Sequence, residues 1–589
     1  MENNEQYYDK ETLKRLKELT EEVAPGMAEE TDRATANAVD SALELADANG
    51  QKDTLIATID LQIGLNFFRT DNKTVYATLP SGVHAEVGGQ EFQDYILSVA
   101  YSMEPRYFIS DKGQSDIARW FKFQVTESRK DDYQMHKIFK RVGQDQTDNS
   151  VWILSSVAPI KYIHVTPDSI TEETNSPLKI VLNQESLPLP PVAPTADFSL
   201  INNYLNVEKN QLPLVHNFII ESYCAKKEYQ IMQIQGQHHT GKTTLIQILY
   251  KLIDPNENDV GQPTDAWSNM IRATSTHLLN YDNMEKANME KDFASMMSKI
   301  STETSYQKRT HHSNRGLTTL KTKNPQIVAS IQQVLEQFDV HSRSIVINPP
   351  ILKASNNTYK NDFWDAFNND YPTIFNGILK AVQHVLKTKD SVSKENLERM
   401  SEAHVIGRAL DSFEGLEWGI TYDTALADNK ELINDSLIDA FPMAQLLKIL
   451  LDENNNQPIK KSPTAWLHYL AQLKFPSTPG GVSEKSVLAE TSPNTTKGVT
   501  TAFRNIISPL SKQGIILHQG KDRDNAENKP QRYWKLSKLG VEPVTPVTSV
   551  TDTRETLPSV SDASDACDTF EQTVLVEGNY EGSIFEKRK

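Results

Sequence analysis

The stretch that decides the fold runs from Gln230 to Ile253 and reads QIMQIQGQHHTGKTTLIQILYKLI. A short β-leaning run precedes Gly236, and apolar residues recur at helical spacing after Lys242. The order is therefore strand, glycine-bearing loop and helix. The segment from Gly236 to Thr243 matches the pattern G-x-x-x-x-G-K-T, and this order is the context that the pattern requires. We therefore predict a loop that binds the phosphates of a nucleoside triphosphate.

The residue types in the loop explain why it would bind phosphate. Gly236 and Gly241 let the backbone curl so that its N–H groups face the phosphates. Lys242 can reach the β- and γ-phosphates of ATP, and the Thr243 hydroxyl can ligate Mg²⁺. The alternative is a glycine-rich turn that happens to precede Lys-Thr. The predicted nucleotide-binding residues are Gly236, Gln237, His238, His239, Thr240, Gly241, Lys242, Thr243 and Thr244.

The composition bounds the class of protein. The chain has 589 residues, 38% of them apolar and 24% charged, which fits a soluble globular protein with several domains. The N-terminus lacks the apolar core of a signal peptide, and no apolar run is long enough to span a membrane. The two cysteines lie far apart in sequence and suit reduced thiols, so we expect a cytoplasmic protein. A net charge of −17 argues against a protein that coats nucleic acid with its whole surface, but it permits local basic patches.

Shifts in composition divide the chain into consecutive parts. The predicted parts are a helical N-terminal segment (1–50), an α+β domain (51–183), a stiff Pro-rich linker (184–197), the core with the phosphate loop (198–390), a helical segment (391–455), a basic unit (462–540) and an acidic tail (541–589). The linker carries four prolines, which exclude it from a sheet or a helix interior. The tail is rich in Thr, Ser, Pro and Asp, and this composition predicts disorder.

An acidic residue at the end of a neighbouring strand is needed to position Mg²⁺ beside a phosphate loop. The segment THLLNYDNME (276–285) supplies Asp282 after a buried-strand signal, 40 residues beyond Lys242. We therefore predict that Asp282 and Thr243 hold Mg²⁺. The next position, where an acid usually orients the attacking water, holds Asn283.

A basic, turn-like segment follows, SYQKRTHHSNRG (305–316), and it precedes QIVAS (326–330), which reads as a buried strand. A hairpin that displays Lys308, Arg309 and Arg315 would suit contact with a phosphate backbone. A solvated loop is the alternative reading of these charges.

Arg343 stands just before a further apolar strand. An arginine at such a place can reach a γ-phosphate across a subunit interface. An ordinary surface ion pair is equally compatible with the sequence.

Taken in order, these parts resemble the superfamily-3-like, or D5-type, helicase ATPases of phages, plasmids and integrative elements, which are often primase-associated. The resemblance extends over about residues 50–450. It is carried by the phosphate loop, LLNYDN (278–283), YQKR (306–309), QIVAS (326–330), RSIVINPP (343–350), FWDAFNNDYPTIFNGILKAV (363–382) and, upstream and downstream, KTVYATLP, FQDYILSVAY, VWILSS and LERMSEAHVIGRAL.

The resemblance implies an AAA+-like core in a ring, commonly a homo-hexamer. ATP and Mg²⁺ would lie between subunits, and the basic hairpin would grip one DNA strand in the pore. Arg343 would be the arginine finger that acts in trans. Primase or other replication proteins are possible partners. Where the family tends to place a polar sensor at the end of the strand, this chain has Ala329, for which Ser330 or Gln332 could substitute.

The C-terminal basic unit follows the order helix, helix, hairpin, which is the pattern of a winged helix. Residues 485–540 contain ten Lys/Arg against four Asp/Glu, the electrostatic footprint expected of a DNA-binding module. A protein-binding winged helix is the alternative. The residues expected on the buried face of the second helix are Val499, Phe503, Ile506, Ile507 and Leu510. The predicted DNA contacts are Lys497, Arg504, Lys521, Arg523 and Arg532.

The sequence thus predicts a multidomain α/β protein. Its parts would be a P-loop NTPase core of AAA+-like, superfamily-3 type, an N-terminal α+β domain and a C-terminal winged helix. The predicted function is an ATP-dependent, helicase-like DNA motor for replication of a mobile genetic element. Two alternatives stay open: a DNA-bound NTPase switch that does not translocate, and a scaffold that binds ATP but hardly hydrolyses it. The basic hairpin favours the motor, whereas Asn283 and Ala329 favour the alternatives.

Overall fold

The computed structural model describes most of the chain between residues 51 and 539. Within that span it leaves out 71–73, 104–105, 129–132, 146, 184, 259–260, 310–316, 336, 353–359, 475–483 and 523–530. The predicted N-terminal helical segment and the predicted disordered tail lie outside the described residues. The described residues form a mixed α/β fold, as the sequence predicts.

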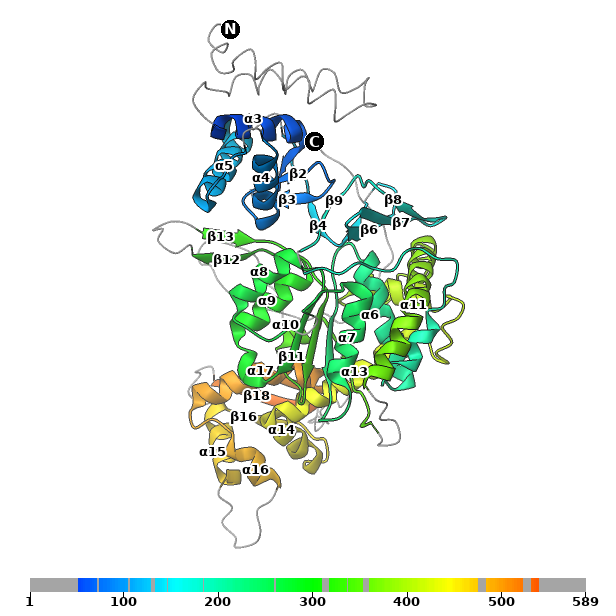
Figure 1. Ribbon diagram of the computed structural model, residues 1–589. Helices are drawn as coiled ribbons and strands as arrows, with labels where there is room; N and C mark the ends of the chain where they lie inside the picture. The colour runs from blue at the N-terminus through cyan, green and yellow to red at the C-terminus, as the bar shows by residue number, and fades with distance from the viewer. Residues whose placement is uncertain are drawn as a thin grey trace, which may run out of the picture. The chain divides into compact units, whose positions relative to one another are not determined.

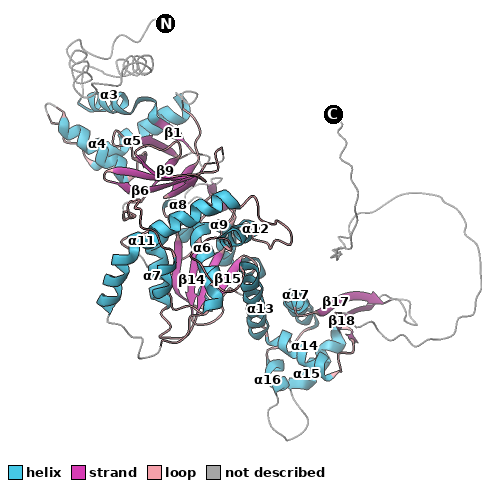
Figure 2. Ribbon diagram, turned by 90° about the vertical axis from the view of Figure 1, so that its right-hand side faces the viewer, coloured by secondary structure: helices cyan, strands magenta, loops and turns pink. Residues whose placement is uncertain are grey.

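The quoted stretch contributes its strand to a parallel sheet with the order β11–β14–β10–β15 (Figure 2). Its strands are β10 (Ile231–Gln235), β11 (Leu279–Met284), β14 (Gln326–Ser330) and β15 (Ser344–Ile347). They are buried almost throughout, as expected of parallel strands that are covered on both faces. The strands predicted from LLNYDN, QIVAS and RSIVINPP are thereby confirmed.

Helices cover both faces of this sheet (Figure 1). Successive side chains point to opposite faces, so Ile327 and Ala329 of β14 belong to one hydrophobic core, here called the central core, and Val328 belongs to another. The helices of the central core are α6 (Leu212–Cys224), α7 (Lys242–Ile253), α11 (Lys360–Thr388), α12 (Ser401–Leu410) and the start of α13 (Tyr422–Ala440). The helices of the other core are α8 (Ala266–Ser275), α9 (Lys291–Ser301) and α10 (Phe338–His341).

The N-terminal α+β region has two parts that belong to different cores. The first part has its own core, formed by α3 (Gln51–Ile63), α4 (Gln90–Ser102), α5 (Asp111–Phe123), β1 (Phe67–Arg69), β2 (Val75–Thr78) and β3 (His84–Glu86). The second part, here called the accessory sheet, has the order β8–β7–β6–β5–β4–β9. Its strands are β4 (Ile138–Lys140), β5 (Val142–Gln144), β6 (Val151–Val157), β7 (Ile160–Val165), β8 (Ile170–Glu173) and β9 (Lys179–Val181). Ile153 and Ile163 of this sheet lie in the central core, so this half of segment 51–183 packs with the parallel sheet.

The Pro-rich segment 184–197 is not a free linker. Leu189 is 6% exposed and belongs to the central core. The N–H groups of Leu187 and Leu189 donate to Pro255 O and Ser155 O at 2.8 and 2.9 Å. The segment expected to be a stiff linker therefore packs on the central core through Leu189. Prolines exclude regular structure here, but the apolar residues between them still pack.

The basic segment after β11 forms the expected hairpin. Strands β12 (Tyr306–Arg309) and β13 (Leu317–Leu320) pair antiparallel, with Lys308 opposite Thr318. The turn 310–316, which includes Arg315, lies outside the described residues. In sequence the hairpin stands between β11 and β14.

The core of the C-terminal unit begins earlier than the predicted boundary at residue 462. Met443 and Leu447 of α14 (Pro442–Glu453) share a core with Trp466 and Trp534. The preceding helix, α13 (Tyr422–Ala440), ends just before Pro442, a residue that suits the first turn of a new helix. The rest of the unit comprises β16 (Ile459–Lys461), α15 (Pro463–Lys474), α16 (Glu484–Glu490), α17 (Thr496–Lys512), β17 (Ile515–Asp522) and β18 (Gln531–Lys538).

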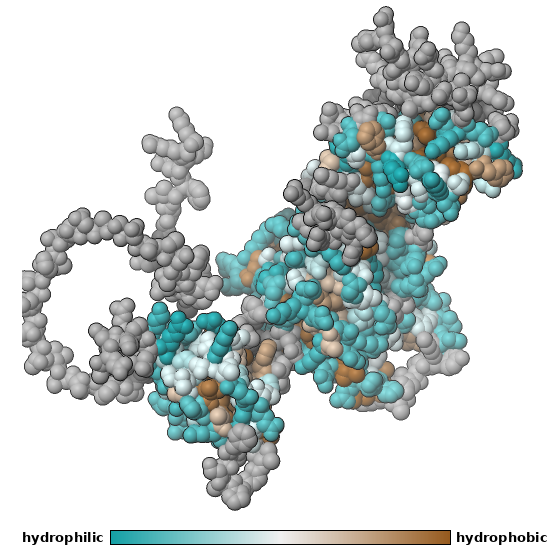
Figure 3. Space-filling model, turned by 90° about the vertical axis from the view of Figure 1, so that its left-hand side faces the viewer, coloured by the Kyte–Doolittle hydropathy of each residue, from teal (hydrophilic) through white to brown (hydrophobic). Residues whose placement is uncertain are grey.

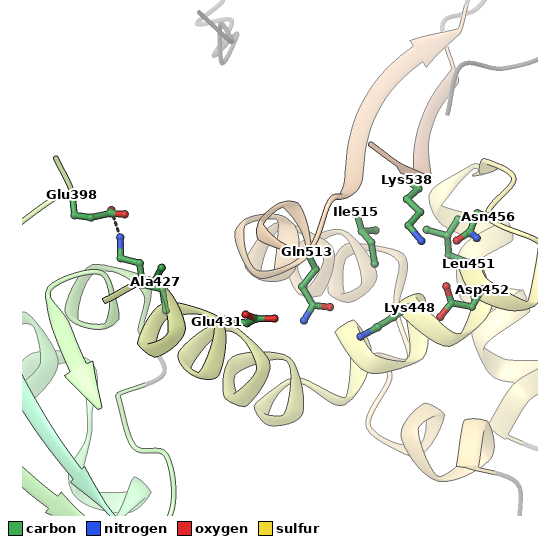
Figure 4. A pocket seen from close by; sticks show the side chains of 11 residues that line it. Glu398, Ala427, Glu431, Lys448, Leu451, Asp452, Asn456, Gln513, Ile515 and Lys538 are labelled. Carbon is green, nitrogen blue, oxygen red and sulfur yellow. Dashed lines mark ion pairs between the residues drawn. The ribbon is translucent and has the colours of Figure 1, made fainter. Parts of the chain in front are cut away.

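A cleft of about 570 Å³ is lined by residues of α13 and of the C-terminal unit (Figure 4). Glu431 lines it from α13, and Lys448 and Asp452 line it from α14. Lys430, which also lines the cleft, forms an ion pair with Glu398. The cleft is thus lined by both acidic and basic groups, so it does not favour a ligand of one sign of charge.

The surface drawn in Figure 3 is predominantly hydrophilic, with apolar residues scattered over it. None of the described helices combines the length and the apolar content that a bilayer-spanning helix needs.

Candidate functional site

The loop from Gly236 to Thr243 curls around the Lys242 ammonium. Lys242 Nζ donates to the carbonyl oxygens of Gly236 and Gln237 at 2.7 and 2.8 Å. Gly241 has a φ of +76°, a left-handed conformation that favours glycine. A Cβ at Gly236 would lie 2.8 Å from Thr240 Oγ1, so the backbone approaches that side chain too closely for a larger residue. Partial burial lowers the pKa of Lys242, and the nearby Asp282 carboxylate opposes the shift.

The other loop residues divide into exposed and inward-facing groups. Gln237, His238 and His239 are exposed. Thr240 is 2% exposed and donates its hydroxyl to Gln237 O at 3.0 Å, so it shapes the loop. Thr244 is half-buried in the first turn of α7.

Thr243 and Asp282 meet although 39 residues separate them in sequence. Thr243 Oγ1 donates to Asp282 Oδ2 at 3.0 Å, and the other carboxylate oxygen accepts from Asn283 N at 2.9 Å. Asp282 is 3% exposed, and its own N–H donates to Gly261 O at 2.9 Å. These contacts fix a carboxylate beside the N-terminus of α7.

Asn283 lies at a β-bulge, where the register between β11 and β14 shifts after Tyr281. Its φ is +53°, a conformation that asparagine tolerates better than most residues, and its side chain is exposed. The next acid along the chain, Glu285, caps the short turn Lys286–Asn288. The exposed position beside Asp282 therefore carries an amide.

Ser330 and Gln332, the two residues that could replace a polar sensor at the end of β14, differ in exposure. Ala329 and Ser330 are both buried, and the Ser330 hydroxyl accepts from Gln233 Nε2 at 3.0 Å. Gln332, two residues beyond the strand, is exposed. Because Gly236 N donates to Ser330 O at 3.1 Å, this strand end lies directly beside the phosphate-loop motif. Gln332 is therefore the better sensor candidate.

Two residues that the sequence did not single out support the loop from outside. Asn206 Nδ2 donates to Thr240 O and Pro350 O at 3.0 and 2.7 Å. The N–H of Leu352 donates to His239 O at 3.0 Å. Both contacts join segments far apart in sequence, and Asn206 and Leu352 themselves lie outside every motif quoted above.

Arg343 lies at the opposite end of the parallel sheet from the loop. Its carbonyl accepts from Ile231 N, at the start of β10, whereas Gly236 follows the end of that five-residue strand. The strand length separates the two by about 16 Å. Arg343 therefore does not belong to the Lys242 site of its own chain.

The Arg343 side chain shares one carboxylate with a second arginine. Arg343 Nη2 and Arg399 Nη2 donate to Asp339 Oδ1 at 3.0 and 2.6 Å. The Arg343 side chain is 13% exposed, whereas that of Arg399 is 41% exposed. Two guanidinium groups on one carboxylate leave a net positive charge at this edge. Sequence reasoning missed Arg399 because the residue lies in an irregular stretch before α12.

The base of the hairpin interleaves aromatic rings and lysines. Lys308 Nζ lies 5.5 Å from the centroid of the Trp267 ring, and Lys299 Nζ lies 5.0 Å from that of Tyr306. The two aromatic rings have their centroids 6.2 Å apart. Lys308 is exposed. The side chain of Arg309 and the whole of Arg315 lie outside the described residues.

The C-terminal unit presents its predicted basic residues on two elements. Lys497 and Arg504 are exposed on α17, and Arg504 Nη2 donates to Gln519 Oε1 at 3.3 Å. On the hairpin, Lys521 and Arg532 lie directly opposite each other in the register of β17 and β18. Like charges at directly opposed positions destabilise a sheet. Arg523 lies outside the described residues.

The buried face of α17 differs from the expected one at a single residue. Val499, Phe503 and Leu510 are fully buried, and Ile506 is 2% exposed. Ile507 is 37% exposed, because the residue after Ile506 is turned by about 100° around the helix.

A scan against protein families finds no match, and no curated protein matches the chain. Among solved structures, one described as SCCmec type IV Cch, an active helicase, is similar at 12% identity and a TM-score of 0.39. That alignment covers 78% of this chain and 90% of the other. The C-terminal region of NrS-1 is similar at 12% identity and a TM-score of 0.34, with 81% and 99% covered. At these identities and scores the similarities assign no family, and the function proposed below rests on the residues of the site.

Proposed function

We propose that the chain is an ATP-hydrolysing motor that translocates on DNA, in the replication of a mobile genetic element. The observation that carries the proposal is the Thr243–Asp282 pair beside the Lys242 ammonium. A hydroxyl, a buried carboxylate and an ammonium converge there on a curled loop at a helix N-terminus. That combination suits the phosphates of ATP together with a divalent cation.

The donor set fits Mg²⁺. Thr243 Oγ1 and the Asp282 carboxylate offer hard oxygen ligands, and Mg²⁺ takes one or two such protein ligands in addition to phosphate oxygens. When bound, the ion would neutralise charge on the β- and γ-phosphate oxygens. The described residues contain no group of three His, Cys, Asp or Glu side chains that could hold a metal without the nucleotide.

The remaining steps fall to the chain's own side chains. Lys242 would leave its two carbonyl partners and donate to the γ-phosphate. Gln332, exposed two residues beyond the strand whose end contacts Gly236, would orient the attacking water. Arg343 or Arg399 of a neighbouring subunit would stabilise the charge that develops on the transferred group, since neither belongs to the Lys242 site of its own subunit. A closed ring, for which a hexamer is our expectation, would supply that neighbour at every site.

The hairpin is the proposed grip on single-stranded DNA. Lys308 with the Trp267 and Tyr306 rings forms the alternation of cation and aromatic surface on which a strand of any sequence can bind and stack. Because β12 and β13 lie in sequence between the Asp282 strand and β14, motion of the hairpin can be coupled to the nucleotide.

The C-terminal unit is proposed to be a winged helix that binds duplex DNA. Its hairpin β17–β18 pairs with β16, and α17 packs against the same core. Lys497 and Arg504 on the helix and Lys521 and Arg532 on the wing would contact phosphates.

A DNA-bound ATPase switch that does not translocate is the second candidate. Asn283 favours it, because an amide cannot accept the proton of the attacking water as a carboxylate can. In a switch, slow hydrolysis would time the release of a partner.

ATP turnover with and without single-stranded DNA, together with unwinding of a forked duplex, tests the motor. We expect turnover that single-stranded DNA stimulates, and unwinding that requires ATP. Turnover that DNA stimulates without any unwinding or displacement of a bound block would favour the switch. No nucleotide binding at all would contradict both candidates.

A further inference from the structure

The accessory sheet contacts both connections that join the hairpin β12–β13 to its core. On the incoming side, Lys137 Nζ lies 3.0 and 3.1 Å from the two carboxylate oxygens of Glu303, three residues before β12. Glu303 has a φ of +56°, so the chain turns sharply at this point. On the outgoing side, the contacts come from Lys140, at the end of the same strand region.

Lys140 joins the outgoing connection to helix α8. Its Nζ donates to Asn324 Oδ1 at 3.1 Å and also to the Thr322 hydroxyl, both in the stretch between β13 and β14. The same ammonium donates at 2.8 Å to Ala273 O, in the last turn of α8. A cation suits the carbonyl end of a helix. Because α8 also carries Trp267, one side chain links both elements of the proposed DNA grip.

The segment that carries these lysines, β4 and the residue before it, is itself fixed to the parallel sheet. Arg141, the next residue, is fully buried and forms an ion pair with Asp254. The other Asp254 oxygen accepts from the N–H groups of His277 and Leu278 at 2.8 and 3.1 Å, at the start of β11. The accessory sheet is therefore anchored to β11, the strand that carries Asp282, while it also contacts the segments on either side of the hairpin.

We propose that Lys137 and Lys140 are positioning residues that set the hairpin in the register in which DNA binding accelerates hydrolysis. This inference rests on the proposed motor function. It gives the accessory sheet a defined role: the sheet is the fixed support against which the hairpin moves. Loss of the contacts of either lysine would leave DNA binding intact, because the DNA-facing groups stay in place. It would weaken the coupling between DNA binding and ATP hydrolysis.

The test compares charge reversal at two matched ion pairs of the accessory sheet. Lys137→Glu breaks the pair with Glu303, whose side chains are 48% and 26% exposed. Lys161→Glu breaks the pair with Glu172, whose side chains are 46% and 32% exposed and which lies on β7 and β8. We expect Lys137→Glu to lower the DNA-stimulated turnover about two- to fivefold, the range that an exposed ion pair can supply. Basal turnover and affinity for single-stranded DNA should stay unchanged, and Lys161→Glu should match the wild type.

Reciprocal exchange provides the rescue. Glu303→Lys should reproduce the defect, and Lys137→Glu combined with Glu303→Lys should restore most of the stimulation. Equal effects of Lys137→Glu and Lys161→Glu on stimulation would overturn the proposal.

Hydrogen exchange of the hairpin amides gives a readout that does not involve DNA. Exchange in 306–309 and 317–320 should become faster in Lys137→Glu than in Lys161→Glu. Unchanged exchange in Lys137→Glu would show that the Lys137–Glu303 contact does not restrain the hairpin, and it would also overturn the proposal. A wild type whose turnover ignores DNA would instead contradict the motor function, even if the exchange result stands.

Discussion

The Thr243 hydroxyl lies 3.0 Å from the Asp282 carboxylate and so joins the first turn of α7 to the end of β11. The parallel order of β10, β14 and β11 brings these ends to one edge of the sheet. Side chains on two segments thus form one site, and each segment can be tested separately.

Lys242→Ala should reduce ATP turnover by about a hundredfold or more, the effect of removing one strong stabiliser of transition-state charge. Its ammonium is the cation enclosed by the loop carbonyls of Gly236 and Gln237. Phosphate release under saturating ATP is the measurement. Lys291→Ala, at an exposed lysine of α9, is the matched control. Normal turnover in Lys242→Ala would remove the basis of the proposed site.

Asp282→Asn should retain nucleotide binding but lose Mg²⁺-dependent hydrolysis, because a neutral amide is a poor ligand for a hard cation. Binding of a fluorescent ATP analogue and turnover over a Mg²⁺ titration separate the two effects. Hydrolysis that survives at ordinary Mg²⁺ concentrations would mean that the metal carboxylate lies elsewhere.

Asn283→Asp should raise turnover by about tenfold or more, because a carboxylate at this exposed position can act as the missing base. Aspartate tolerates the left-handed backbone of residue 283, so the fold should be retained. A thermal melt checks stability beside the turnover assay. An unchanged rate would indicate that another step or another group limits hydrolysis.

In the pure Arg343→Ala variant, ATP turnover should fall by about a thousandfold, as expected for loss of an arginine finger that acts in trans. In mixtures with wild-type subunits, activity should fall more steeply than the mutant fraction rises. Arg399→Ala tests whether the more exposed partner of Asp339 behaves in the same way. A strictly linear decline for both variants would indicate independent subunits.

Replacing Lys521 and Arg532 together with Ala should weaken duplex binding and reduce the slope of log affinity against log salt by about two. Stability should not fall, because the two cations oppose each other across the strands. Fluorescence anisotropy over a salt series measures the slope. Lys538→Ala, at the far end of β18, is the control. A slope equal to the wild-type value would place the duplex contact elsewhere.

Lys140 should make stability depend on pH in the neutral to alkaline range. Burial lowers its pKa from 10.5 to about 7 in the folded protein. Between these values the unfolded chain binds more protons than the native one, so wild-type stability rises with pH, by at most about 1.4 kcal/mol per pH unit. Below pH 7 Lys140 is protonated in both the folded and the unfolded state, so the free-energy cost of burying its charge lowers the stability in full. Lys140→Met should remove this slope in denaturant titrations from pH 7 to 9.5, and parallel curves would contradict the assignment.

Local patterns predicted the elements of the site but not its surroundings. The loop and its flanking strand and helix could be read from Gly236–Thr243, because glycine spacing and helical periodicity are properties of adjacent residues. The strand before Asp282 and the hairpin at Lys308 could be read for the same reason. The support from Asn206 and the sharing of Asp339 by Arg343 and Arg399 depend on contacts between distant segments, which no local pattern encodes.

Composition alone does not show the contacts that hydrophobic packing makes across the predicted segments. Prolines and polar residues near Leu189 look like a linker, yet the leucine is buried in the central core. Polar residues between α14 and β16 suggest a break, yet Leu447 packs with Trp534. Composition gives the average polarity of a segment, whereas one buried apolar side chain is enough to pack that segment against a core.

The shared central core has a consequence for how such proteins can be assembled in evolution. Ile153 and Ile163 of the accessory sheet pack in the same core as Ile246 and Leu249 of α7. A gene fusion or deletion at the Pro-rich segment would expose apolar surface on both fragments. The smallest part that can be exchanged between related proteins as a unit therefore includes β4 to β9, whereas the portion from α3 to α5, with its separate core, can be gained, lost or replaced on its own.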